Sequence, residues 1–228
     1  MAQISDQKIP SPVVDYRELR LQNLGSDTYR HLLLLIFWPV FGILFAYVER
    51  YYPVEYYTPM HSVLDDYIPF CEWFVLPYLF WFMYLAGMLL YTVLYDIDAY
   101  KKMMWFIIIT YSITLIIYLI WPTCQELRPM TFERDNIFTR IMDSYYQFDT
   151  NTNVCPSLHV IGGIAVQFTF LHCKGKKHIG LHIVFIVTTV LICMSTVFLK
   201  QHSIIDVFAA LPVCMLGYLL CFTPLRRC

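Results

Sequence analysis

The sequence is poor in charge. Only 14% of its 228 residues are Asp, Glu, Lys or Arg, whereas soluble domains carry roughly a quarter. Hydrophobic residues make up 58% and aromatic residues 18%, and the mean hydropathy is +0.55. The net charge of −1 excludes a strongly basic nucleic-acid-binding protein. We therefore interpret the chain as an integral membrane protein that forms one membrane domain, residues 1–228.

Metal-binding and redox motifs are absent as well. The eight cysteines form no CxxC pair and no zinc-ligand spacing, and we expect most of them to be small buried hydrophobic residues. Cys124 and Cys155 flank one polar loop and could form a disulfide if that loop faces an oxidising compartment. The first thirty residues are polar, so no cleavable signal peptide is expected, and no myristoylation or prenylation motif is present.

Long apolar runs are abundant. A helix that crosses a bilayer needs about 20 mostly apolar residues, and six segments approach that length. The expected spans are 31–49, 70–95, 103–121, 157–173, 178–198 and 202–222. A polar loop, 122–155, separates the third span from the short fourth one. The sequence thus predicts an all-α bundle of six transmembrane helices over about 31–222, preceded by an N-terminal segment, 1–30.

Basic residues are distributed unevenly between the two ends of this bundle. Six spans place both termini on one side, and that side holds eleven of the sixteen lysines and arginines. Because cytoplasmic loops carry the excess of basic residues, we expect both termini in the cytoplasm. The expected location is the plasma membrane, and a bacterial membrane fits better than an endoplasmic reticulum.

Polar residues gather at four segment ends on the opposite, non-cytoplasmic side. They lie in the stretches PTCQELRPM, CPSLHV and STVFLKQHSIID. The candidate site residues are, in order, Gln125, Arg128, Ser157, His159, Ser195, Lys200, His202 and Asp206. Because these four ends share one side of the expected bundle, we expect the active site to be built from residues 121–206.

His202 and Asp206 are four residues apart and so share one face of a helix. A carboxylate there can accept a hydrogen bond from one imidazole nitrogen and leave the other free as a nucleophile or base. An ionisable residue in a membrane segment costs roughly 2.5–3.5 kcal/mol, which makes it a functional candidate. Alternatively, Asp206 is an ordinary carboxylate at a helix start. A metal site formed with His159 is a further alternative, although no additional ligand is evident at helical spacing.

The stretch CPSLHV suits an anion. Pro156 fits the first turn of a helix, where its missing N–H is not needed. Ser157 can donate to a ligand or cap the helix, and the free N–H groups of a helix start attract negative charge. His159 can give or take a proton, although a single interfacial histidine is more often structural. Arg128 and Lys200 add positive charge on the same side.

Together these stretches resemble the type 2 phosphatidic acid phosphatase family. The family signature is K-x6-R-P, then P-S-G-H, then S-R-x5-H-x3-D, and the match covers residues 121–206. The matching positions are Arg128, Pro129, Pro156, Ser157, His159, Ser195, His202 and Asp206. The resemblance implies that His202 attacks phosphorus, that Asp206 orients it, and that His159 protonates the leaving oxygen.

The resemblance also implies a phosphate site, from which two cations of the signature are missing. Trp121 replaces the first lysine, Leu158 replaces the glycine, and Thr196 replaces the arginine of the third element. Lys200, one turn beyond, is the natural substitute. The expected phosphate-binding residues are Arg128, Ser157, Lys200, Ser195 and Gln125. The P-S-L-H form, with Gln before the catalytic His, also resembles the inositol phosphorylceramide synthase branch, whose members move a phospho-headgroup to a lipid alcohol.

The expected function is that of a lipid-phosphate phosphatase that hydrolyses a phosphomonoester or diphosphate through a phosphohistidine at the non-cytoplasmic face. The alternatives are headgroup transfer to a lipid alcohol and a non-enzymatic six-helix membrane protein. We expect no metal or other cofactor, because the cations and the helix dipole supply the electrostatic stabilisation. The expected partners are a lipid phosphate and the bilayer, with no nucleic acid. The lipid and the oligomeric state stay open.

Overall fold

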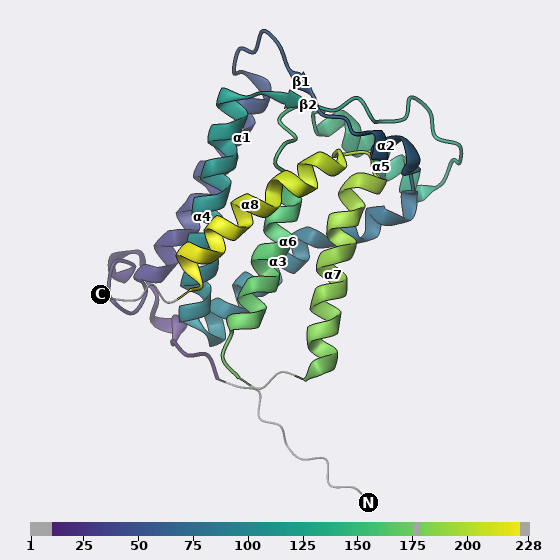
Figure 1. Ribbon diagram of the computed structural model, residues 1–228. Coiled ribbons are helices and arrows are strands. Elements are labelled where there is room, and N and C mark those ends of the chain that lie inside the picture. Colours follow the sequence, from purple (N-terminus) through teal and green to yellow (C-terminus); the bar gives the residue numbers. More distant parts are fainter. Residues whose placement is uncertain (1–10, 176–177, 224–228) are drawn as a thin grey trace, which may run out of the picture.

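The computed structural model describes residues 11–175 and 178–223, and they form an α-helical bundle (Figure 1). Its long helices are α1 (Phe37–Arg50), α3 (Val75–Tyr95), α4 (Ile97–Ile120), α6 (Leu158–His172), α7 (Ile179–Phe198) and α8 (Ile204–Cys221). The shorter ones are α2 (Val63–Tyr67), α5 (Ile137–Phe148), η1 (Tyr16–Glu18), η2 (Leu21–Asn23), η3 (Arg30–Ile36) and η4 (Glu72–Phe74). Two-residue strands, β1 (Thr58–Pro59) and β2 (Thr123–Cys124), pair in parallel. The all-α prediction is therefore confirmed.

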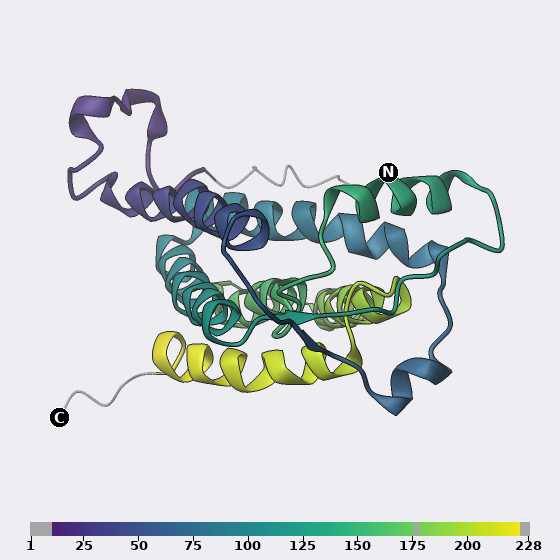
Figure 2. The ribbon, with the colours of Figure 1, turned by 90° about the horizontal axis from the view of Figure 1, so that it is seen from above.

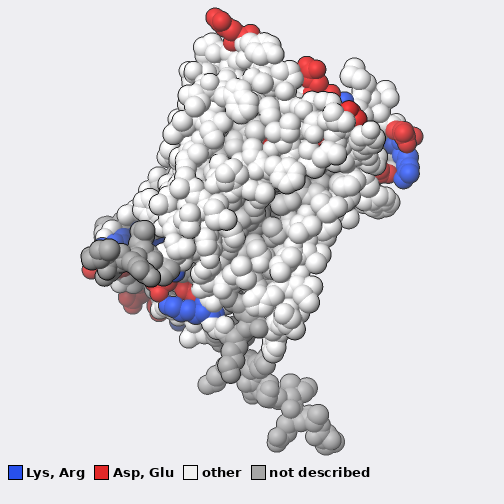
Figure 3. All heavy atoms as spheres, viewed as in Figure 1, with Lys and Arg blue, Asp and Glu red and all other residues white. Residues whose placement is uncertain are grey.

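Within the described ranges, five helices are long and apolar enough to cross a membrane. These are Arg30–Arg50, Glu72–Tyr95, Ile97–Ile120, Ile179–Phe198 and Ile204–Cys221, where the first two include the 3₁₀ turns η3 and η4. The sixth apolar helix, α6, has only 15 residues. On the face drawn in Figure 3, charged side chains gather at the two ends of the bundle and other residues cover the surface between them. This distribution is compatible with an integral membrane protein.

The short helix α6 lies in the middle of the bundle. It contacts α3, α4, α7 and α8, and the view from above shows these helices around it (Figure 2). Its residues Val160, Ile161, Ala165 and Val166 are completely buried. Because neighbouring helices surround α6, its length is not dictated by the bilayer thickness alone. The first turn of α6 therefore begins inside the protein, below the upper end of the bundle, where β1, β2, α2 and α5 lie in Figure 1.

Helix α4 starts at Ile97, six residues before the start predicted from hydropathy. Asp96 explains the difference, because its Oδ1 accepts a hydrogen bond from the backbone N–H of Ala99 (3.2 Å). Its Oδ2 accepts from the backbone N–H of Lys174 (2.7 Å). The cap lets the helix begin in a charged stretch, which a hydropathy criterion excludes.

The polar loop predicted over 122–155 contains the helix α5. Asn136 caps this helix, with its side-chain oxygen accepting from the N–H groups of Phe138 (2.9 Å) and Thr139 (3.1 Å). The apolar side of α5 packs beside the start of α3: the Tyr145 and Tyr78 rings are 5.3 Å apart. Helix α5 is amphipathic and lies over the upper end of the bundle (Figure 1).

Close packing of α8 on α4 gives a first prediction. A Cβ added at Gly217 would lie 2.7 Å from Thr110 Cγ2 and 2.8 Å from Phe106 Cε2. Overpacking of this kind typically costs about 1–3 kcal/mol. We expect Gly217→Ala to lower the free energy of unfolding by that amount in detergent. Gly42→Ala is the control, because nothing lies within 4 Å of a Cβ at that position. Equal stability of the two variants would contradict the packing.

Candidate active site

His202 and Asp206 form a buried pair at the upper end of the bundle, where α8 begins. The Nδ1 atom of His202 lies 3.2 Å from Oδ2 of Asp206. The same oxygen accepts a hydrogen bond from the backbone N–H of Ser203 (3.0 Å). Asp206 is completely buried. Because a carboxylate accepts, Nδ1 carries the imidazole proton, and the lone pair of Nε2 is left for chemistry.

His159 faces this pair from the first turn of α6. Its ring centroid is 6.4 Å from that of His202. The imidazole is stacked on Tyr78, at 4.3 Å between centroids, and is tilted against Trp81, at 4.4 Å. Its Nε2 is buried and has no hydrogen-bond partner. The two histidines are thus held by different elements, and they face one another without a direct bond.

Both histidines line a cavity of about 260 Å³. Its walls are mostly aromatic and come from α1, α3, α4 and α5; they include Trp38, Phe41, Phe45, Trp81, Tyr111, Tyr118 and Tyr145. Polar lining comes from Glu49, Asp149, Asn153 and Gln201. None of the lysines and arginines within the described ranges lines it. The cavity therefore has mostly apolar walls and a smaller set of polar lining groups that includes both histidines.

Arg128 is anchored beside this cavity by the protein itself. Its Nη1 donates to the carbonyl oxygens of Tyr146 (3.2 Å) and Asp149 (2.9 Å). Its Nη2 donates to the carbonyl oxygen of Thr150 (2.8 Å) and to Oε1 of Gln201 (2.6 Å). Only Nε is buried without a partner. Burial lowers the pKa of Arg128, while Asp149, whose carboxylate lies 3.9 Å away, opposes that shift.

Ser157 and Gln125 each keep one buried hydrogen-bonding group unused. The backbone N–H of Ser157 donates to the carbonyl oxygen of Asp206 (3.2 Å), but its Oγ has no partner. Gln125 accepts from the N–H of Leu127 (2.7 Å), and its Nε2 has no partner. Ser195 differs, since its Oγ donates to the carbonyl oxygen of Ile192 (2.6 Å). Pro156 precedes the helix, contrary to the prediction, because Ser157 occupies the N-cap position.

Lys200 is directed toward α2. Its Nζ donates to the backbone carbonyl oxygen of Asp65 (2.8 Å), and it is not among the residues that line the cavity. Burial lowers the pKa of Lys200, and the charges of Asp65 and Asp66 oppose that change. Thr196, where the family has arginine, donates to the carbonyl oxygen of Cys193 (2.8 Å). Whether Lys200 replaces that arginine stays a prediction.

Asp65 supports the site, although no motif in the sequence indicates it. Its carboxylate accepts from Ser203 Oγ (2.6 Å) and from the backbone N–H of Ile204 (2.9 Å). The side chain is buried, and these two partners lie 138 and 139 residues away in the chain. Asp65 lies in a short polar segment next to Asp66, so only its capping position after Ser62 could have drawn attention to it.

Glu49, Asp149, Asn153 and Gln201 are further site residues that the sequence analysis missed. Gln201 immediately precedes His202, and the other three come from α1 and from the end of the loop before α6. The pKa of Asp149 is raised by burial, against the lowering effects of Arg128 and His202. Only the adjacency of Gln201 to His202 was a usable signal.

Two further expectations concern cysteines and metals. Cys124 and Cys155 are both buried and free of a disulfide. Burial raises the pKa of the Cys155 thiol to about 12. No group of three or more His, Cys, Asp or Glu residues in 11–175 and 178–223 is arranged to hold a metal ion.

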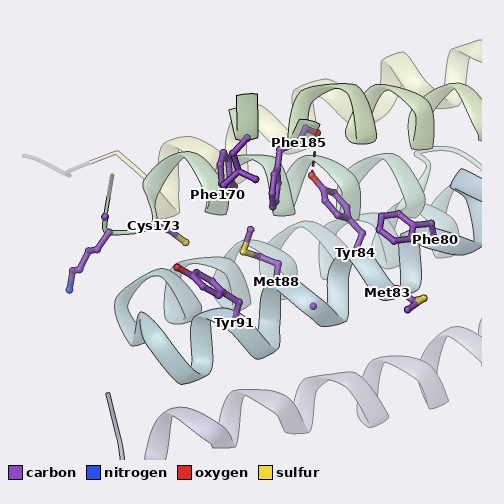
Figure 4. A pocket seen from close by; sticks show the side chains of 12 residues that line it. Phe80, Met83, Tyr84, Met88, Tyr91, Phe170, Cys173 and Phe185 are labelled. Atoms are coloured by element: carbon purple, nitrogen blue, oxygen red, sulfur yellow. Dashed lines mark hydrogen bonds between the residues drawn. The ribbon is translucent and has the colours of Figure 1, made fainter. Parts of the chain in front are cut away.

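A second cavity, of about 450 Å³, lies between α3, α6 and α7. Figure 4 shows Tyr84, Met88 and Tyr91 of α3 facing Phe170 and Phe185, with the Tyr84 hydroxyl donating to the carbonyl oxygen of Phe185 (3.3 Å). None of the predicted site residues lines it. The histidine-lined cavity, which holds the predicted site residues His159 and His202, is therefore the candidate active site.

Comparison with known proteins assigns no family or function to the chain, so a functional proposal has to rest on the geometry of the site. No protein-family model, curated protein or solved structure gives a significant match to the chain.

The support from Asp65 gives a second prediction. Hydrogen bonds to a buried charge contribute about 1.5–3 kcal/mol each. We expect Asp65→Ala to destabilise the protein by at least ~2 kcal/mol, measured by thermal unfolding in detergent. Asp66→Ala is the matched control, because Asp66 is exposed and pairs only with His61 among the described residues; surface changes usually stay within about 0.5 kcal/mol. Equal effects of the two substitutions would contradict this role.

Proposed function

We propose that the chain is a membrane enzyme that transfers the phosphoryl group of a lipid phosphate through His202. The observation that carries this proposal is the His202–Asp206 pair, at 3.2 Å, which faces His159 across one cavity. A histidine with one nitrogen bound to a carboxylate and the other free is equipped for nucleophilic attack. A second histidine that faces the first across the cavity can carry a proton to and from the reacting oxygen.

In the proposed first step, Nε2 of His202 forms a bond to phosphorus, and the bond between phosphorus and the leaving oxygen breaks. His159, protonated at this stage, donates its proton to that oxygen. In the second step water attacks phosphorus, His159 takes a proton from the water, and the N–P bond breaks. Asp206 keeps the proton on Nδ1 of His202 and stabilises the charge that develops on the ring.

The buried groups without partners support a phosphate site beside His202. Ser157 Oγ, Gln125 Nε2, Gln201 Nε2 and Arg128 Nε are hydrogen-bond donors that the protein leaves unpaired, and of these residues Gln201 lines the cavity. Buried polar groups are paired in more than nine cases in ten. A ligand rich in acceptor oxygens would satisfy the Gln201 amide, and a phosphate offers such oxygens at the place where charge develops in transfer.

Headgroup transfer to a lipid alcohol is a second candidate, favoured by the character of the cavity. Its aromatic walls extend from the histidines to α1 and α4. An apolar chamber of this kind would accommodate a lipid alcohol beside the phosphohistidine and disfavour water. Hydrolysis and transfer share the first step and differ only in the acceptor of the second.

We further propose a plasma-membrane location, with both termini in the cytoplasm and the site at the opposite face. The support is the excess of lysine and arginine on the side of the termini, eleven of sixteen. The site lies at the end of the bundle formed by β1, β2, α2 and α5 (Figure 1). A substrate would then enter from the outer leaflet.

A covalent phosphohistidine provides the test of mechanism. We expect His202→Ala to form no phosphoenzyme with a ³²P-labelled substrate that has a good leaving group. His159→Ala should still be labelled, because such a substrate needs little protonation, but should lose the label about 10²–10⁴-fold more slowly. Asp206→Asn should lie between them. The measurement is rapid-quench labelling with mass-spectrometric mapping of the acid-labile site. Label in His202→Ala, or label on His159, would contradict the assigned roles.

The orientation is tested by cysteine accessibility in a variant without native cysteines. Ser144→Cys, on the exposed side of α5, should react with a membrane-impermeant thiol reagent on intact cells. Ser26→Cys, exposed between η2 and η3, should react only after lysis. The opposite pattern would place the site in the cytoplasm and overturn the proposed location.

A further inference from the structure

Two carboxyl groups line the histidine cavity. Apart from tyrosines, its ionisable lining groups are Glu49, Asp149, His159 and His202, and no described lysine or arginine is among them. Arg128 lies behind Asp149, with 3.9 Å between Nη2 and Oδ2, and its terminal N–H groups are bound to carbonyl oxygens and Gln201. A phosphomonoester dianion in this cavity would therefore face two carboxylates with little free positive charge to balance them.

The hydrogen-bond donors that line the cavity include uncharged amide side chains, whereas a phosphate site would be expected to contain lysine or arginine. Gln201 and Asn153 both line the cavity and are 2% and 4% exposed. Gln201 Oε1 accepts from Arg128 (2.6 Å), which leaves its Nε2 without a partner. Neither Nδ2 nor Oδ1 of Asn153 has one. Amide N–H groups stabilise an oxygen that carries a partial or single negative charge, and they add no charge of their own.

The two carboxylates are held near these amides. Oε1 of Glu49 accepts a hydrogen bond from Thr150 Oγ1 (2.9 Å), and Thr150 follows Asp149 in the chain. Both acids also lie beside aromatic rings of the same cavity, among them Phe45 and Tyr145. Carboxylates together with ring faces are the surroundings that bind an ammonium group.

Resting on the proposed function, we propose that the cavity binds the headgroup of a zwitterionic phosphodiester lipid. The phosphate monoanion contacts the amides of Gln201 and Asn153, and the ammonium group pairs with Glu49 and Asp149. The headgroup is held at both of its ends, whereas the glycerol side meets the apolar walls. His202 therefore bonds to phosphorus while the bond to the diacylglycerol oxygen breaks, and His159 protonates that oxygen. Water or a lipid alcohol then takes the phospho-headgroup from His202.

The test compares three lipids with identical acyl chains in mixed micelles with the purified full chain. Phosphatidylethanolamine is a zwitterionic diester, phosphatidylglycerol is an anionic diester, and phosphatidic acid is a monoester. All three release diacylglycerol in the proposed step, so one assay gives kcat/KM for each. We expect phosphatidylethanolamine to exceed the other two by about tenfold or more, the effect of one charged hydrogen bond.

The substitution Glu49→Gln tests the proposed ammonium contact separately from the proposed phosphate contact. This variant should lose about 10- to 100-fold in kcat/KM for phosphatidylethanolamine and gain in kcat/KM for phosphatidic acid, because it no longer repels the dianion. Glu55→Gln, at an exposed position of the loop after α1, is the matched control and should leave all three values unchanged. Thermal unfolding of each variant reports whether the fold is intact. If Glu49→Gln does not fold, the lipid ranking of the unaltered chain still decides.

The outcomes distinguish this inference from the proposed function. Equal or faster turnover of phosphatidic acid, or an equal loss for all three lipids in Glu49→Gln, would overturn the zwitterionic headgroup and leave phosphoryl transfer standing. Absence of both diacylglycerol and phosphohistidine with every lipid and with an activated substrate would overturn both.

Discussion

Two buried carboxylates hold the stretch between α7 and α8, and the arrangement at the upper end of the bundle depends on them. Asp206 accepts from the N–H of Ser203 and from His202, and Asp65 accepts from the Ser203 hydroxyl and from the N–H of Ile204. Burying a carboxylate is unfavourable unless several donors surround it. The donors available to these two are largely the backbone and side chains of residues 203–204, so the turn can adopt few other conformations, and the imidazole is oriented with it.

Arg128 links this turn to the polar segment that covers it. Its four terminal N–H groups bind three carbonyl oxygens at the end of α5 and one oxygen of Gln201, and its guanidinium lies over the Tyr146 ring at 4.6 Å. An arginine engaged in this way organises its neighbours and has little capacity left for a ligand. Its effect on a substrate passes through Gln201, whose amide is turned so that its N–H groups remain free.

Local patterns in the sequence were sufficient to predict the long helices and the contact between His202 and Asp206. Apolar runs located the long helices to within a few residues, except where Asp96 caps α4 early. The i, i+4 spacing of His202 and Asp206 predicted their contact. Contacts between residues that are far apart in the sequence could not be predicted. Nothing near Asp65 in the sequence indicates that it binds Ser203, 138 positions away. The direction of Lys200 toward α2 is likewise a tertiary property. Helix α5 was not predicted because its 12 residues, five of them polar, are too short a run for a membrane span.

The charge around the site depends on few ionisable groups. Trp121 and Thr196 are uncharged where the signature that the sequence resembles has lysine and arginine, and Glu49 and Asp149 place two carboxyl groups on the cavity. Two unit charges 4 Å apart interact by about 4 kcal/mol at an effective dielectric constant of 20. A dianion would be repelled by each carboxylate. A phosphate with one charge and an attached ammonium group removes the repulsion and turns the carboxylates into ligands, so the proposed headgroup accounts for the carboxyl groups and the uncharged amides of the cavity together.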